Sequence, residues 1–177
     1  AAMVVGTVLS LVFAGMFFLV EPLLRATGLD EDMARGTGRV SMHFAWGMTP
    51  ILLYVACGYF LESIKRPMVG MAIMLAANVL NIAADGIVCL GWFGWVEPMG
   101  AVGAVATTSA VRWLSFIAIL VYILTMRDAA SYGVFVRVEH VGRRGWRGLK
   151  GGFPIGIALS LEAAAISSLT FMAGHLG

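Results

Sequence analysis

Charged residues divide this sequence into long apolar stretches, and this pattern restricts the fold more than any other feature. A helix needs about 20 apolar residues to cross a bilayer. Overall, 60% of the residues are hydrophobic and 12% are charged, more apolar surface than a soluble domain can bury. The sequence therefore predicts an all-α, polytopic integral membrane protein in contact with the lipid bilayer. Its five expected spans are Ala1 to Leu24, Val40 to Leu61, Pro67 to about Val96, Pro98 to Met126, and Gly151 to Gly177.

The two ends of the chain are both apolar. The sequence begins without an initiator methionine inside a hydrophobic segment, and it has no basic segment of the kind that opens a signal peptide. It also ends inside an apolar run. We therefore expect the chain to be a fragment of a longer membrane protein.

The connections between the expected spans differ in charge. Basic residues gather on one side of the expected membrane, and basic loops face the cytoplasm. Three basic residues fall on the other side, which also holds the acidic segment LDEDMARG. The connection 127–150 is a basic cytoplasmic linker on this interpretation. The basic side holds Lys65, Arg66, Arg127, Arg137, Arg143, Arg144, Arg147 and Lys150.

Several functional classes receive no support from the sequence. The net charge is only +2, and no basic face interleaved with aromatic residues indicates nucleic-acid binding. No metalloprotease, nucleophile-elbow or P-loop pattern is present, so we expect neither an enzyme nor a bound cofactor. Cys57 and Cys89 lie in apolar runs and are expected to be small core residues.

Three ionisable residues lie well inside the expected spans: Asp85, Arg112 and Glu162. A charge at the centre of a bilayer costs about 2.5–3.5 kcal/mol on insertion scales, so such residues usually face a cavity or a partner. At the rise of a helix, Asp85 lies about 27 Å from Pro67, and Arg112 lies about 22 Å from the inner boundary. These depths allow an ion pair between Asp85 and Arg112 as well as a functional site.

The segment ANVLNIAADGIV places a polar stripe around Asp85. Asn81 and Asp85 are four residues apart and share one face of a helix, and Asn78 lies close to the same stripe. A one-sided polar stripe on an apolar helix indicates that this face points into a polar interior. Glu162 would lie about 13 Å past Phe153, near the middle of the bilayer.

Five segments, taken together, resemble the multidrug and toxic compound extrusion (MATE) transporters in order and spacing. The resemblance covers essentially the whole chain. The segments are EPLLRATGLDEDMARGTGRV, FLESIKRP, NVLNIAADGI, LGWFGWVEPMGAVGAVATTSAVRW and GGFPIGIALSLEAAAISSLTFMAGHLG.

This resemblance implies a transporter of twelve helices in two bundles of six. The five spans would then be the third to seventh helices. Residues 1–126 would belong to the first bundle, 127–150 to a cytoplasmic linker, and 151–177 to the first helix of the second bundle. The family exports organic cations and drugs in exchange for sodium ions or protons, so the resemblance implies a monomeric antiporter in a cell membrane, here the bacterial inner membrane.

The resemblance also implies a role for four residues. Asn81 and Asp85 match a polar pair that lines the cation site of the first bundle and can hold Na⁺. Thr108 falls where a polar group of the sixth helix lines the same cavity, and Glu162 matches a glutamate of the NorM-like branch in the second bundle. Many members have asparagine where this chain has Asp85, and the presence of both carboxylates leaves the choice between sodium and proton open.

Two other functions were weighed against antiport. A lipid-linked sugar flippase of the same superfamily should have a cavity richer in Arg and Lys, whereas Arg112 is the only basic residue inside a span here. A non-transporting membrane scaffold would need neither Asp85 nor Glu162, so neutral substitution of each would leave its function intact.

Overall fold

The computed structural model describes residues 2–26, 28, 30–134 and 141–175. The chain divides into two compact units, one of residues 5–137 and one of residues 138–177 together with 1–4. Five of the described segments are long and apolar enough to cross a membrane, which confirms the predicted fold class. The elements are α1 (Ala2–Phe17), α2 (Val20–Ala26), α3 (Glu31–Ser63), α4 (Pro67–Val88), the 3₁₀ helix η1 (Trp92–Gly94), α5 (Gly100–Thr125) and α6 (Val141–His175).

The first predicted span is broken into α1 and α2. Pro22 has no N–H group, and its ring crowds the carbonyl four residues earlier, at Phe18. The helix is interrupted at Phe18 and Leu19, whose N–H groups bond three residues back, to Gly15 and Met16.

The second predicted span is longer than expected, because α3 begins at Glu31 rather than at Val40. Asp30 is its N-cap residue, and the carboxylate accepts a hydrogen bond from the N–H of Asp32 at 3.2 Å. Glu31 and Asp32 lie in the first turn, where negative charge is favourable. The acidic segment therefore starts a helix instead of forming a loop.

The third predicted span ends early, at Val88 rather than near Val96. Gly91, Phe93 and Gly94 all have positive φ angles, which an α-helix cannot accommodate. The chain folds back so that Trp92 lies against Gly86, where an added Cβ would come within 2.3 Å of the indole.

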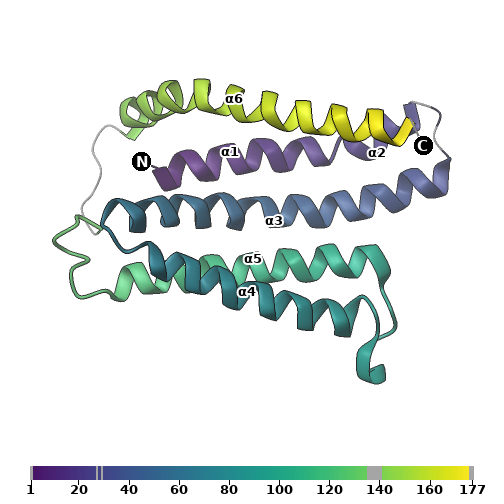
Figure 1. The fold of residues 1–177 in the computed structure, drawn as a ribbon, viewed down its shortest axis with the longest axis horizontal. Helices are drawn as coiled ribbons and strands as arrows, with labels where there is room; N and C mark the ends of the chain where they lie inside the picture. Colours follow the sequence, from purple (N-terminus) through teal and green to yellow (C-terminus); the bar gives the residue numbers. More distant parts are fainter. Residues whose placement is uncertain (1, 27, 29, 135–140, 176–177) are drawn as a thin grey trace. The chain divides into compact units, whose positions relative to one another are not determined.

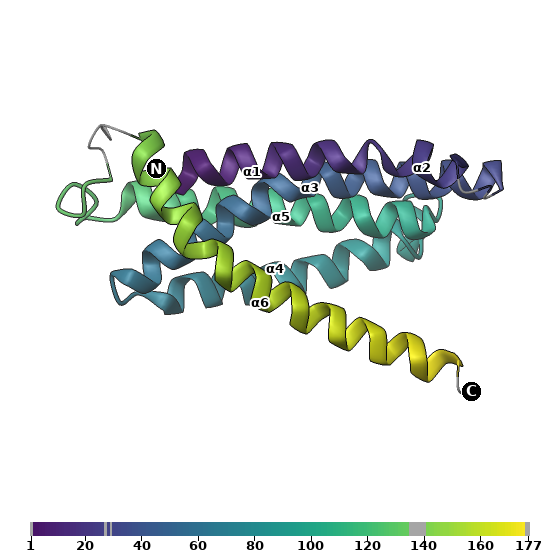
Figure 2. The ribbon, with the colours of Figure 1, turned by 90° about the horizontal axis from the view of Figure 1, so that it is seen from above.

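Helix α3 occupies the middle of the larger unit, with α1 and α2 on one side and α5 on the other (Figures 1 and 2). Phe17 of α1 stacks on Phe44 of α3, with ring centroids 6.1 Å apart. The Ser109 hydroxyl of α5 donates to the carbonyl of His43 in α3 at 2.7 Å. Helix α4 packs antiparallel on α5, and the Tyr54 hydroxyl of α3 donates to the α4 carbonyl of Gly70 at 2.7 Å.

An ion pair joins two segments at one end of the larger unit. The guanidinium of Arg66, before α4, donates to the carboxylate of Asp128, after α5, at 2.6 Å. The hydrogen bond with Asp128, followed by one with Tyr122, raises the pKa of Arg66 above its ordinary value. The basic residues Lys65, Arg66 and Arg127 therefore lie at the same end, as the alternation of loops requires.

The smaller unit consists mainly of α6, which begins at Val141. The last ten residues of the segment predicted as a linker, 141–150, are therefore helical. This segment contains glycines and basic residues, which had suggested a connection. Residues 151–175 continue the same helix and contain Pro154 and Glu162.

Candidate functional site

Asp85 is held between α4 and α5. The side-chain amide of Asn81, one turn earlier on α4, donates to Oδ2 of Asp85 at 2.7 Å. On the opposite helix, the hydroxyl of Thr107 forms a hydrogen bond with Oδ1 of Asp85. Both carboxylate oxygens therefore have a partner, which offsets part of the cost of placing a charge inside the membrane.

Thr107 can serve either protonation state of this carboxyl group. Its hydroxyl is also within hydrogen-bonding distance of the carbonyls of Gly103, at 3.1 Å, and Ala104, at 2.9 Å. The hydroxyl has one proton and two lone pairs. It can donate to an ionised Asp85, or it can accept from a protonated Asp85 while donating to its own helix.

The threonine expected beside Asp85 was Thr108, but the hydroxyl of Thr108 donates to the carbonyl of Ala104 at 2.8 Å. Its neighbour Thr107 forms the hydrogen bond with the carboxylate instead. Adjacent residues on a helix point about 100° apart, so the choice depends on how α5 is rotated against α4. The two helices are antiparallel, and Val88 facing Gly103 fixes the register that brings Thr107 to Asp85.

Arg112 does not pair with Asp85. Among the described residues, Arg112 is in no ion pair, and its guanidinium lies over the ring of Phe44, 5.5 Å from the centroid. An atom added at Gly47 of α3 would lie 3.2 Å from Nη1 of Arg112. The arginine therefore reaches toward α3, away from the carboxylate on α4, and the proposed structural ion pair is absent from this part of the chain.

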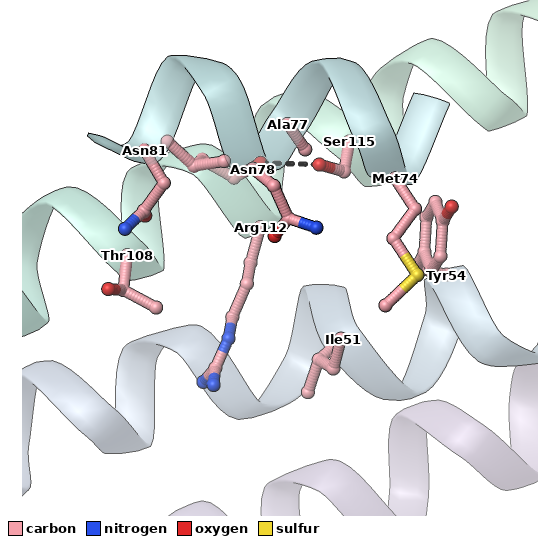
Figure 3. A pocket seen from close by; sticks show the side chains of 10 residues that line it. Ile51, Tyr54, Met74, Ala77, Asn78, Asn81, Thr108, Arg112 and Ser115 are labelled. Carbon is pink, nitrogen blue, oxygen red and sulfur yellow. Dashed lines mark hydrogen bonds between the residues drawn. The ribbon is translucent and has the colours of Figure 1, made fainter. Parts of the chain in front are cut away.

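A cavity of about 290 Å³ lies between α3, α4 and α5. Figure 3 shows Arg112 extending from α5 toward α3, with Asn78 and Asn81 of α4 near its stem. Thr108 lines this cavity, and its predicted place at the cation site stays a prediction. The lining residues are Ile51, Tyr54, Met74, Ala77, Asn78, Asn81, Thr108, Val111, Arg112 and Ser115.

Asn81 connects the cavity with Asp85. It lines the cavity, and its amide also holds Asp85, which is not among the lining residues. The carboxylate and the cavity are thus separated by a single amide side chain. A change in the charge or ligation of Asp85 would reach the cavity through this amide.

The donor set around Asp85 suits a hard monovalent cation or a proton. The described residues hold no group of three or more His, Cys, Asp or Glu side chains that could bind a metal ion. One carboxylate, one hydroxyl and one amide offer oxygen ligands, which alkali cations prefer over nitrogen or sulfur. A sodium ion would require the amide of Asn81 to turn its oxygen toward the carboxylate.

Glu162 lies in the smaller unit, on α6. Its side chain is exposed there, and it is the only carboxylate in the described part of residues 151–175. Glu162 therefore belongs to a different unit from the other three predicted residues.

The family model MatE matches residues 1–87, a segment that includes Asn81 and Asp85. The chain is also 27% identical to "Probable multidrug resistance protein NorM" of Bacillus cereus over 88% of its length. It is 28% identical to the protein of the same name from Aromatoleum aromaticum over 96% of its length, and 26% identical to the one from Caulobacter vibrioides over 86%. Residues 1–87 are therefore similar to the MatE family, and most of the chain is similar to these NorM proteins.

The chain spans about a third of the length of these curated relatives, covering 34% of the Bacillus protein and 37% of the Aromatoleum protein. No solved structure matches it significantly. The helical architecture and the membrane-spanning segments agree with this similarity, and the protein is a multi-pass membrane protein.

Proposed function

We propose that this chain forms part of a multidrug transporter that exports organic compounds across a bacterial cytoplasmic membrane in exchange for sodium ions or protons. Support comes from the family match, from relatives named as multidrug resistance proteins, and from the arrangement around Asp85. The substrates are small organic molecules, and the transporter acts as a monomer.

The observation that carries this proposal is the position of Asp85 beside a polar cavity. A carboxylate that only stabilised the fold would need a permanent cationic partner, and Arg112 points elsewhere. Asp85 instead has neutral partners, Asn81 and Thr107, which can rearrange when a cation or a proton binds. Polar groups of this kind inside a span typically mark ion pathways.

Coupling needs a difference in affinity between two conformations. A cation that bound both conformations with equal affinity would not change their relative populations. Binding at Asp85 neutralises its charge and weakens it as a hydrogen-bond acceptor for the Asn81 amide. The amide then reorients, turning its oxygen toward a bound sodium ion or releasing a protonated carboxyl group. Because Asn81 also lines the cavity, occupation of the cation site and the cavity wall change together.

The substitution Asp85→Asn tests this proposal, because asparagine keeps the shape but cannot carry the charge. The complete transporter would be reconstituted in liposomes, and export of ethidium would be followed under a sodium gradient and, separately, under a proton gradient. We expect Asp85→Asn to abolish the response to the coupling gradient while ethidium binding in detergent persists. Asp32→Asn, at the exposed start of α3, is the matched control and should transport normally.

Normal transport by Asp85→Asn under both gradients would refute the assignment of the coupling site. Absence of transport by the wild-type protein under either gradient would refute the antiport function itself. That second result would favour the scaffold alternative.

A further inference from the structure

Arg112 is a cation inside a membrane span without a carboxylate partner in the described part of the chain. It lies near the middle of α5, and its guanidinium contacts the face of Phe44 and the backbone region of Gly47. A cation–π contact satisfies only one face of a guanidinium, whose five N–H donors lie in the plane. These donors remain directed toward the space between α3 and α5.

The cavity wall around Arg112 is built from further hydrogen-bonding groups and from apolar surface. Asn78 and Asn81 bring amides from α4, and Thr108 brings a hydroxyl from α5 (Figure 3). On the apolar side, Ile51, Met74 and Val111 provide aliphatic surface. Specific ligand sites typically combine such apolar walls with a few convergent polar groups.

The charge of this cavity does not match a purely cationic substrate. All its lining residues are neutral except Arg112, so the cavity wall carries a net positive charge. A second positive charge placed beside Arg112 would be repelled, strongly so where water is scarce, so a cation such as ethidium is expected to bind away from this cavity. A carboxylate would instead be attracted, and a guanidinium fork matches its two oxygens in a bidentate geometry.

We propose that the cavity between α3, α4 and α5 binds the carboxylate of amphipathic, carboxylate-bearing substrates, with Arg112 as the anion-recognising residue. This inference rests on the proposed transport function and specifies its substrate class as zwitterions or organic acids. Asn78, Asn81 and Thr108 supply secondary hydrogen bonds to the carboxylate. The aliphatic residues contact the ring that carries it, and the volume of about 290 Å³ accommodates a benzoate-sized group.

A matched pair of dyes separates this proposal from binding of cations in general. One dye is a rhodamine with a free carboxylate on its phenyl ring, and the other is the methyl ester of the same rhodamine. Binding of both to the complete protein in detergent is measured by fluorescence polarisation, without any ion gradient. We expect Arg112→Gln to weaken binding of the carboxylate dye about tenfold, as expected for loss of a charge-assisted hydrogen bond, and to leave binding of the ester unchanged.

Two further variants serve as controls. Arg127→Gln removes a basic residue outside the spans and should affect neither dye. Arg112→Lys keeps the charge but loses the fork, so its affinity for the carboxylate dye should fall between wild type and Arg112→Gln. Because binding is measured without an ion gradient, a failure of cation coupling would leave this measurement unaffected.

The following outcomes of the binding measurements would contradict the proposal. Equal weakening of both dyes by Arg112→Gln, or an unchanged affinity for the carboxylate dye, would overturn the proposal. If Arg112→Gln does not fold, as a melting curve will show, Arg112→Lys replaces it. Equal affinities of Arg112→Lys and wild type for the carboxylate dye, or failure of the wild type to prefer it over the ester, would likewise overturn it.

Discussion

At the scale of single residues, the carboxyl group of Asp85 depends on two neutral partners rather than on a countercharge. An exposed ion pair is worth little, and a buried one fixes both charges in place. Hydrogen bonds from Asn81 and Thr107 stabilise the group without a permanent countercharge, which fits the proposal that it binds and releases a cation or a proton. This is the balance that a coupling site requires, because its ligand must bind and leave in each cycle.

The two adjacent threonines of α5 provide a matched test of this arrangement. Thr107→Val removes the hydroxyl that bonds Asp85, and hydrogen bonds to charged groups contribute about 1.5–3 kcal/mol. We expect the apparent affinity for the coupling ion, measured from the gradient dependence of ethidium export, to change about tenfold or more. Thr108→Val removes a hydroxyl bonded only to its own helix and should leave that affinity unchanged. The reverse pattern would place the site at Thr108, as the sequence had predicted.

Part of this site could be predicted from the sequence. Asn81 and Asp85 lie on one face of one helix, and their spacing alone brings them together. Thr107 could not be selected over Thr108, because that choice depends on the rotation of α5 against α4. The separation of Arg112 from Asp85 was likewise undetermined, since depth in the membrane allowed the contact and only the direction of the side chain excludes it.

At the scale of helices, α3 and α5 approach closely where α3 carries Gly47. A Cβ at this position would lie 2.6 Å from Oγ and 3.1 Å from Cβ of Ser109, a fully buried residue. Small residues at such crossings let backbones approach and gain van der Waals contact, which is the main source of helix association in membranes. The same crossing positions Arg112, whose Nη1 lies beside Gly47.

Two glycines of α3 therefore respond differently to the same substitution. Gly47→Ala forces a methyl group against Ser109, and overpacking of this kind costs about 1–3 kcal/mol. Gly58→Ala meets no atom within 4 Å and should stabilise α3 by roughly 0.5–1 kcal/mol through the lower backbone entropy of alanine. We expect a lower melting temperature for Gly47→Ala and an equal or higher one for Gly58→Ala, measured on the purified protein in detergent. Equal melting temperatures for the two variants would contradict the close crossing.

The ends of the helices were less predictable than their existence. Apolar length located all five spans, but the start of α3 depends on capping by Asp30, and the end of α4 depends on the positive φ angles at Gly91 and Phe93. The start of α6 was missed because basic residues and glycines resemble a connection in composition. Hydropathy reports the apolar part of a helix, whereas a polar extension of the same helix follows from local hydrogen bonding.

At the scale of the whole molecule, each of the two units contains one of the two carboxylates that were predicted to bind the coupling ion. Asp85 belongs to the unit of residues 5–137, and Glu162 belongs to α6 of the other unit. Within the larger unit, the start of α4 and the end of α5 lie at one end, where Arg66 pairs with Asp128. The proposed function assigns a coupling role to both carboxylates, so each needs its own test.

Glu162 provides the test at this scale. A carboxylate in the middle of an apolar helix is costly, and its retention is best explained by a role in the transport cycle. We expect Glu162→Gln to reduce gradient-driven export of ethidium about tenfold, the effect of losing a hydrogen bond or ligand contact to a charged group, while membrane levels of the protein stay near those of wild type. Glu97→Gln, in the exposed segment before α5, is the matched control and should export normally. If Glu162→Gln also exports at the wild-type rate, α6 contributes no coupling carboxylate, and Asp85 is left as the one predicted carboxylate that can carry the coupling.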